Sequence, residues 1–229
     1  PVGKARDGVG GGRPAVRSAA GALQPFSENV MFRTLTRTWG ATLGLLALMP
    51  SAALAHTGVG PTHGFVHGFA HPLLGFDHLL AMVAVGLWAA QRGGRAVWAL
   101  PAAFVGAMIV GGAIGVSGLQ IPAVEAGILA SVLLLGAAIA IAASPALPLA
   151  TGVVAIFALF HGHAHGTEMP VAVSGLFYGA GFAAATALLH AAGVALVLSV
   201  RHLLGTERQA WLRFAGAAIA CAGVVLWVA

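Results

Sequence analysis

Histidine and carboxylate side chains recur in two short stretches of this chain. FHGHAHGTEMP spans residues 160–170 and contains three histidines and a glutamate, and HPLLGFDHLLAMVAVG spans residues 71–86 and contains two histidines and an aspartate. Imidazole nitrogen with carboxylate oxygen, and no thiolate, suits a borderline divalent ion such as nickel, cobalt or zinc better than Cu(I) or calcium. The residue types therefore indicate a site for a divalent transition metal.

The composition indicates an integral membrane protein. Of the 229 residues, 59% are hydrophobic and only 7% are charged, and the mean hydropathy is +0.94. A soluble domain needs more charged surface than this. Six of the eleven Lys and Arg residues precede Trp39, so the rest of the chain is nearly neutral and a nucleic-acid partner is not expected. The single cysteine, Cys221, excludes an intramolecular disulfide and a cysteine-based zinc site.

The first 55 residues are expected to lie outside the functional domain. Residues 1–30 are rich in Gly and Arg and are interpreted as a non-native or disordered extension. Residues 31–55 have the pattern of a secretory signal peptide, with Arg33 and Arg37 before an apolar run that ends in Ala53-Leu54-Ala55. The run is too short to cross about 30 Å of hydrocarbon, so cleavage after Ala55 is predicted. Residues 56–229 then form the transmembrane domain.

The predicted fold class is all-α, a polytopic membrane helix bundle of about six transmembrane helices. A span needs about 20 apolar residues, and lipid offers the backbone no hydrogen-bond partner outside a helix or a closed barrel. The apolar segments that meet this requirement are residues 69–90, 96–116, 122–143, 146–163, 171–200 and 210–228.

The orientation follows from the cleaved signal peptide and from the basic residues. Cleavage places His56 outside the cytoplasm, so the loops after the first, third and fifth helices face the cytoplasm. Arg92 and Arg95 lie in the first of these loops and Arg201 and Arg208 in the last. This distribution agrees with the positive-inside rule.

The spacing of the histidines predicts that several of them share one side of the bundle. His63, His67 and His71 are four residues apart, and His78 follows seven residues later. Pro72 is better placed at the start of a helix than inside one, so His71-Pro72 is expected to mark the start of the first membrane helix. Asp77 and His78 would then lie one to two turns below the outer surface.

The second stretch has the same pattern at the outer end of the fourth predicted helix. His161, His165 and Glu168 lie on one helical stripe if the helix continues that far, and His163 points to the opposite side. Ionisable groups are costly in hydrocarbon and usually mark a pathway or a site. The alternatives are structural polar pairs and, for His190, a hydrogen bond between helices. The candidate metal-binding residues are His56, His71, Asp77, His78, Glu125, His161, His165, Glu168 and His190.

The two stretches resemble the paired signatures of the HupE/UreJ family, which are membrane proteins associated with nickel hydrogenases and ureases. The family pattern matches in the first stretch at His71, Pro72, Gly75, Asp77, His78, Ala81 and Met82. It matches in the second at Phe160, His161, Gly162, Ala164, His165, Gly166, Glu168 and Pro170. His163 occupies a variable position of the pattern.

This resemblance implies a permease rather than an enzyme. Its cargo would be nickel, or in some members cobalt, with no tightly bound cofactor. Its partners would be the metal ion and the lipid bilayer, with a functional link to hydrogenase or urease maturation. The implied location is the bacterial inner membrane, with the mature N-terminus in the periplasm.

Two other functions fit the histidines and acids. An intramembrane metallohydrolase would hold zinc with His and Asp and activate water with Glu168 or Glu125, but the chain has no HExxH motif. An accessory protein would bind nickel and donate it to an enzyme without transport. A transport site differs from both because it must release its ion, and histidines that can be protonated offer coupling to a proton gradient.

Overall fold

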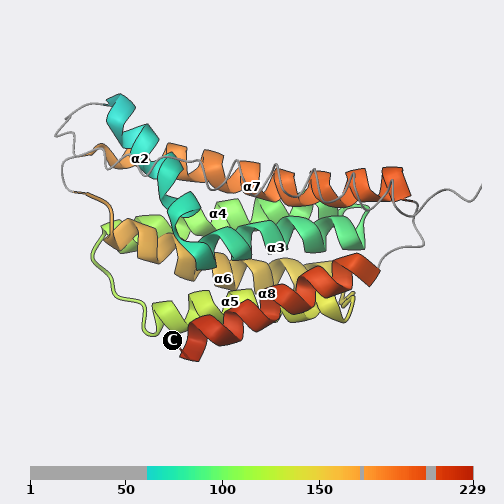
Figure 1. The fold of residues 1–229 in the computed structure, drawn as a ribbon. Helices are drawn as coiled ribbons and strands as arrows, with labels where there is room; N and C mark the ends of the chain where they lie inside the picture. Colours follow the sequence, from blue (N-terminus) through green and yellow to red (C-terminus); the bar gives the residue numbers. More distant parts are fainter. Residues whose placement is uncertain (1–60, 171–172, 205–209, 229) are drawn as a thin grey trace, which may run out of the picture. The chain divides into compact units, whose positions relative to one another are not determined.

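The computed structural model of the protein describes residues 61–170, 173–204 and 210–228, and these residues form seven helices and no strand (Figure 1). The all-α prediction is confirmed. The extension, the signal peptide and His56 lie outside the described residues. The helices are α2 (Pro61–Leu74), α3 (Phe76–Arg92), α4 (Ala96–Val116), α5 (Val124–Ala140), α6 (Leu147–Thr167), α7 (Gly175–Leu204) and α8 (Ala210–Val228).

Helix α3 is the central element of the bundle. It packs against α4, α5, α7 and α8, and its residues 81–90 are all buried except Val83. In a membrane protein an apolar helix can face lipid or other helices, and here neighbouring helices cover almost the whole of residues 81–90. The remaining helices pack mainly in pairs, α2 with α7, α4 with α6 and α5 with α8 (Figure 1).

The helix lengths support a multi-pass membrane protein. Among the described residues, α4, α6, α7 and α8 are each long and apolar enough to cross a bilayer. Helices α2 and α3 meet the requirement only together, as a broken span or a re-entrant loop, and α5 is apolar but has 17 residues. The count of six spans therefore stays a prediction, in which α5 would be the third.

The predicted start of the first membrane helix at His71-Pro72 is wrong. Helix α2 continues through Pro72 to Leu74, and the chain breaks at Gly75, where the helix axes turn by 84°. Pro72 lies in the last turn of α2, where the loss of one backbone hydrogen bond interrupts little helix. Gly75 is extended (φ −87°, ψ 113°), and a Cβ there would lie 3.1 Å from His78 Nδ1 and 3.2 Å from Asp77 Oδ1. The missing Cβ of Gly75 therefore leaves space for the Asp77 and His78 side chains.

Glycines bring the backbones of α4 and α6 into direct contact. A Cβ added to Gly111 would meet the carbonyl oxygen of Leu159, and one added to Gly162 would meet the carbonyl oxygen of Met108. Small residues permit this approach between membrane helices. The contact fixes how far α6 is shifted along α4, and with it the height of His161 and His165 in the bundle.

Three arginine side chains join neighbouring elements at the end of the bundle that is opposite to His161 and His165. Their guanidinium groups donate to backbone carbonyls in the last turns of α3 and α5, which lack partners within the helix, and in the connection between α5 and α6. The bonds run from Arg92 to Pro145 O (2.6 Å), from Arg201 to Gln91 O (3.2 Å) and from Arg213 to Ala140 O (2.8 Å). Basic side chains thus gather at the end that the sequence predicts to be cytoplasmic.

We expect Gly111→Ala to weaken the packing of α4 on α6, because the added methyl group meets the Leu159 backbone. Overpacking of this kind costs about 1–3 kcal/mol. Gly106 is the control, since it is exposed in the same helix and a Cβ there meets nothing within 4 Å. Gly106→Ala should leave stability unchanged or raise it by up to about 1 kcal/mol. Thermal unfolding in detergent would measure both, and equal melting temperatures would contradict the packing argument.

Candidate metal site

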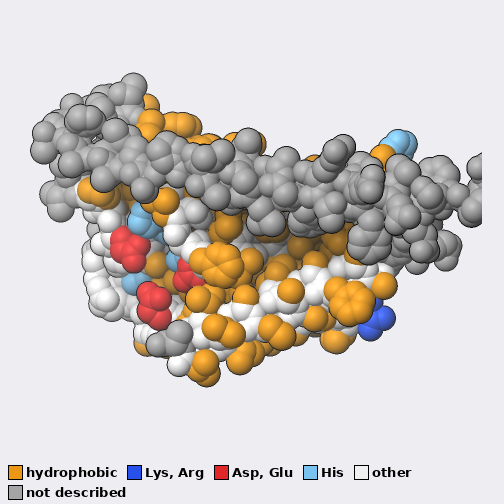
Figure 2. Space-filling model, viewed as in Figure 1, with side chains coloured by type: hydrophobic (Ala, Val, Ile, Leu, Met, Phe, Trp, Pro, Cys, Tyr) orange, Lys and Arg blue, Asp and Glu red, His pale blue; other side chains and the backbone are white. Residues whose placement is uncertain are grey.

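Acidic side chains and histidines gather at the end of the bundle where α2 and the C-terminal part of α6 lie, away from the basic end (Figure 2). His71 comes from α2, His78 from α3, and His161 and His165 from α6. Helix α6 extends to Thr167, so the predicted stripe forms on one continuous helix. Because the chain bends at Gly75, α2 and α3 approach the histidine stripe of α6 from two directions.

The upper group consists of His71, His165 and Glu168. One ligand atom from each of the three lies within 4.8 Å of the others. His71 Nε2 is 3.1 Å from Glu168 Oε2, and both side chains are partly or fully exposed. His165 is buried beneath them, with its ring centroid 4.7 Å from that of His71. Two imidazoles and a carboxylate are a suitable ligand set for a borderline divalent ion.

The lower group begins with His78, whose ring lies between those of His161 and His165. Its centroid is 4.7 Å from His161 and 4.3 Å from His165. Asp77 Oδ1 lies 2.7 Å from His78 Nδ1 and accepts a hydrogen bond from that nitrogen. A neutral imidazole that donates through Nδ1 has its lone pair on Nε2, and Nε2 is buried without a hydrogen-bond partner among the described residues. Asp77 thus orients the His78 ring and leaves Nε2 free, as outer-shell carboxylates do for ligating histidines in metal sites.

Ser131 orients His161 in the same way. Its hydroxyl donates to Ile128 O at 2.6 Å and lies 2.9 Å from His161 Nε2. Because the hydroxyl has one proton, Nε2 must be the donor in the second bond, and the lone pair of His161 is then on Nδ1. Nδ1 is buried and has no hydrogen-bond partner in the described part of the chain. His161 completes the lower group, which we define as His78 and His161 with their orienting residues Asp77 and Ser131.

His165 connects the upper and lower groups. Its ring contacts those of His71 and His78, and it packs on Phe182 with a centroid distance of 3.9 Å. Within the described residues neither of its nitrogens has a hydrogen-bond partner, although both are buried. Either nitrogen can therefore serve as a ligand, so an ion could pass from one group to the other without losing His165.

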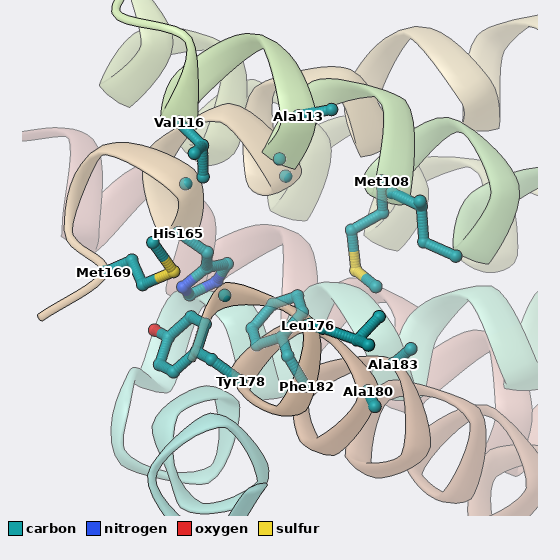
Figure 3. A pocket seen from close by; sticks show the side chains of 16 residues that line it. Met108, Ala113, Val116, His165, Met169, Leu176, Tyr178, Ala180, Phe182 and Ala183 are labelled. Atoms are coloured by element: carbon teal, nitrogen blue, oxygen red, sulfur yellow. The ribbon is translucent and has the colours of Figure 1, made fainter. Parts of the chain in front are cut away.

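An apolar cavity of about 670 Å³ borders His165 between α4, α6 and α7. Figure 3 shows the His165 imidazole pointing toward Met169 and Tyr178 at one end of this cavity. The other lining residues are mostly glycine, alanine and aliphatic side chains. The cavity adds few polar ligands, and the donors remain those of the two histidine groups.

Some predicted site residues lie elsewhere. Glu125 is exposed in the first turn of α5 and makes no hydrogen bond or ion pair to either histidine group among the described residues. His190 is buried deeper, against Phe104, with a centroid distance of 5.0 Å. His163 faces away from the groups, and its Nε2 bonds to Leu119 O at 2.8 Å in the connection between α4 and α5. His163 therefore holds a loop.

Sequence reasoning missed Ser131 and Phe182. Ser131 and Glu125 are the two polar residues of α5, and a lone hydroxyl in an apolar span is a signal for a buried partner. Phe182 carries no such signal, because an aromatic residue in an apolar helix is usually packing.

The whole domain matches a known family model. The model is described as HupE / UreJ protein, and it matches residues 44–226. The chain belongs to the HupE/UreJ family. Protein HupE of Rhizobium leguminosarum bv. viciae is 47% identical over 187 residues, which cover 82% of this chain and 95% of that protein. No solved structure matches the chain significantly. This HupE/UreJ chain is thus a membrane protein of a hydrogenase and urease accessory family, and the two histidine groups lie within the matched region.

We expect Ser131→Ala to weaken nickel binding about tenfold, the low end of the effect of outer-shell partners on metal affinity. Without Ser131, the proton of His161 is free to occupy Nδ1 and block the ligand nitrogen. Ser117→Ala is the control, since Ser117 also donates to the carbonyl three residues before it, Ile114 O, without touching a histidine. Nickel titration of the detergent-solubilised variants would compare them. Unchanged affinity in Ser131→Ala, with His161 still required, would contradict the assigned proton positions.

Proposed function

We propose that this protein is a permease that carries a divalent transition metal, above all nickel, across the bacterial inner membrane to supply enzymes such as hydrogenase or urease. The proposal places the mature N-terminus and the histidine groups on the periplasmic side. Its support is the family membership together with the arrangement of the donor atoms.

The main supporting observation is the change in exposure along one continuous line of donors. The side chains of Glu168 and His71 are 53% and 36% exposed. His165, which joins the two groups, is 4% exposed, the His78 side chain is 11% exposed, and His161 is fully buried. An ion can therefore exchange water for protein ligands in steps, and each step needs only a short movement between neighbouring rings. A site built only to store a metal needs no such series.

The donor types favour nickel or cobalt as cargo. Carboxylate oxygens at the surface attract any cation, whereas the imidazoles beneath them favour borderline transition metals over Mg²⁺ and Ca²⁺. Each imidazole binds the ion only when its ligand nitrogen is unprotonated, so metal entry and proton release are linked. Protons can therefore promote release of the ion.

The positions of the carboxylates give less support to a metallohydrolase. Such an enzyme needs a carboxylate that activates a metal-bound water. Among the described residues, Glu168 pairs with His71 near the surface, Glu125 lies apart, and Asp77 is engaged with His78. The acid residues thus favour cation attraction and ligand orientation.

Uptake of radiolabelled nickel into proteoliposomes, with and without a pH gradient, tests the proposal. A permease accumulates nickel inside the vesicles, and a pH gradient should change the rate, because the imidazoles of the histidine groups bind the ion only when unprotonated. A metal-donating accessory protein binds nickel but leaves the interior empty. Absence of uptake under both conditions, by protein that still binds nickel, would refute transport and favour the accessory role.

Two buried histidines of α6 provide a matched pair of variants. We expect His165→Ala to abolish uptake at equal protein level, because His165 joins both groups. His163→Ala should retain uptake, because His163 contacts the α4–α5 connection, and exposed His202 should also be dispensable. His78→Ala and His161→Ala should behave as His165→Ala does. Normal uptake by His165→Ala, or complete loss in His202→Ala, would contradict these roles.

A further inference from the structure

Two methionine sulfurs and one threonine hydroxyl meet in the buried core of the bundle. Thr186 Oγ1 lies 3.4 Å from Met82 Sδ and 3.5 Å from Met108 Sδ. The three residues come from α7, α3 and α4, and all are buried. We call Met82, Met108 and Thr186 the thioether layer. Three helices thus direct their heteroatoms at one point in surroundings that are otherwise aliphatic and aromatic.

The layer lies between the lower histidine group and His190. Met82 follows His78 by one turn on the same face of α3, and Thr186 precedes His190 by one turn on the same face of α7. Met108 is likewise one turn from Phe104, whose ring contacts both His161 (5.6 Å) and His190 (5.0 Å). Figure 3 shows the Met108 side chain directed from α4 toward α7. The layer and Phe104 together separate the lower group from His190.

His190 is the second observation that points to a ligand. It is 1% exposed, and neither of its ring nitrogens has a hydrogen-bond partner among the described residues. A buried polar group without a partner is costly, and such groups in native proteins call for a specific explanation. A helix-to-helix hydrogen bond, the structural alternative for His190, is not formed within the described part of the chain.

We propose that the thioether layer, with His190 one turn deeper, is a second metal-binding position, which nickel occupies after leaving the histidine groups. This inference rests on the proposed transport function. It assigns ligands to Met82, Met108 and Thr186, which the histidine and carboxylate pattern does not include.

The chemistry of the layer suits a position through which an ion passes. Its donors are neutral, so it binds a divalent cation more weakly than the outer groups, which include Asp77 and Glu168. Thioether sulfur accepts borderline and soft ions, whereas Mg²⁺ and Ca²⁺ require oxygen ligands and Mg²⁺ gives up its water reluctantly. The layer therefore allows release inward and rejects hard cations that the outer carboxylates attract.

Leucine replacements test the sulfurs with little change in volume. Leu and Met exchange in protein cores at small cost, so Met82→Leu/Met108→Leu should keep the fold and the outer groups. Met169→Leu is the matched control, because Met169 lines the same cavity as Met108 but lies at its His165 end and is not part of the layer. The measurements are nickel titration in detergent, X-ray absorption of the nickel-loaded protein, and nickel uptake into proteoliposomes.

The wild-type protein and Met169→Leu should show a tight and a weak nickel-binding event, with a sulfur neighbour in the absorption spectrum at nickel saturation. The double variant should retain the tight event and lose the weak event and the sulfur signal. Its nickel uptake should fall about tenfold, the low end of the loss in affinity or activity when residues around a bound metal are replaced. Its discrimination against Mg²⁺ should also decrease. Titration curves and uptake equal to those of the wild type would overturn the inference.

Thr186 gives an independent test that leaves both sulfurs in place. Thr186→Ser keeps the hydroxyl and should retain the weak event, whereas Thr186→Val removes it and should weaken that event at an unchanged melting temperature. Equal nickel binding by the two variants would overturn the ligand role of Thr186. Wild-type protein that binds nickel without carrying it would refute the transport function, whereas uptake unaffected by the leucines would refute only the thioether position.

Discussion

A buried imidazole can bind a metal only through a nitrogen that carries no proton, so the hydrogen bond at its other nitrogen decides whether it can act as a ligand. In this protein His78 Nδ1 donates a hydrogen bond to Asp77, and His161 Nε2 donates one to the Ser131 hydroxyl. Both bonds turn the free nitrogen of the ring into a potential ligand. The charge of Asp77 would also offset that of a bound cation, which the neutral Ser131 would not do. A cation at His161 would therefore lack the charged orienting partner that His78 has.

The helix packing positions the groups that form these two hydrogen bonds. Gly75 leaves room for the Asp77 and His78 side chains in the first turn of α3. The glycine contacts between α4 and α6 fix the height of His161 in the bundle. Ser131 reaches His161 from α5, on the other side of the central helix from α7. The positions of the rings and of their orienting partners are thus set by four helices. A shift of one helix along its neighbour would separate a ring from its orienting partner. Close glycine packing restricts such shifts, because the backbones touch directly.

The sequence predicted the parts of the site that follow from periodicity. His161 and His165 are four residues apart on one helix, and their shared face is a matter of helix geometry. The break at Gly75 was not predictable in this way, because Pro72 is the stronger helix breaker and only the tertiary packing of Asp77 and His78 favours the glycine. Glu125 stays an untested prediction, and it lies apart from both histidine groups because a similar depth along another helix does not place a side chain on the same face. Ser131, Thr186 and the two methionines depend on contacts between helices far apart in sequence, which a single sequence does not reveal.

The order of donor types along the bundle has a physical consequence for an ion that moves through it. The first donors are an exposed carboxylate and imidazole, the next are buried imidazoles with one charged partner, and the last are neutral sulfur, hydroxyl and imidazole. Desolvation of a divalent ion becomes more costly with depth, while the negative charge that offsets it decreases. An ion on this path would therefore be held most strongly near the surface and less strongly in the core. Under the proposed transport function, inward movement must be coupled to something that weakens the outer groups, and protonation of their imidazoles has that effect.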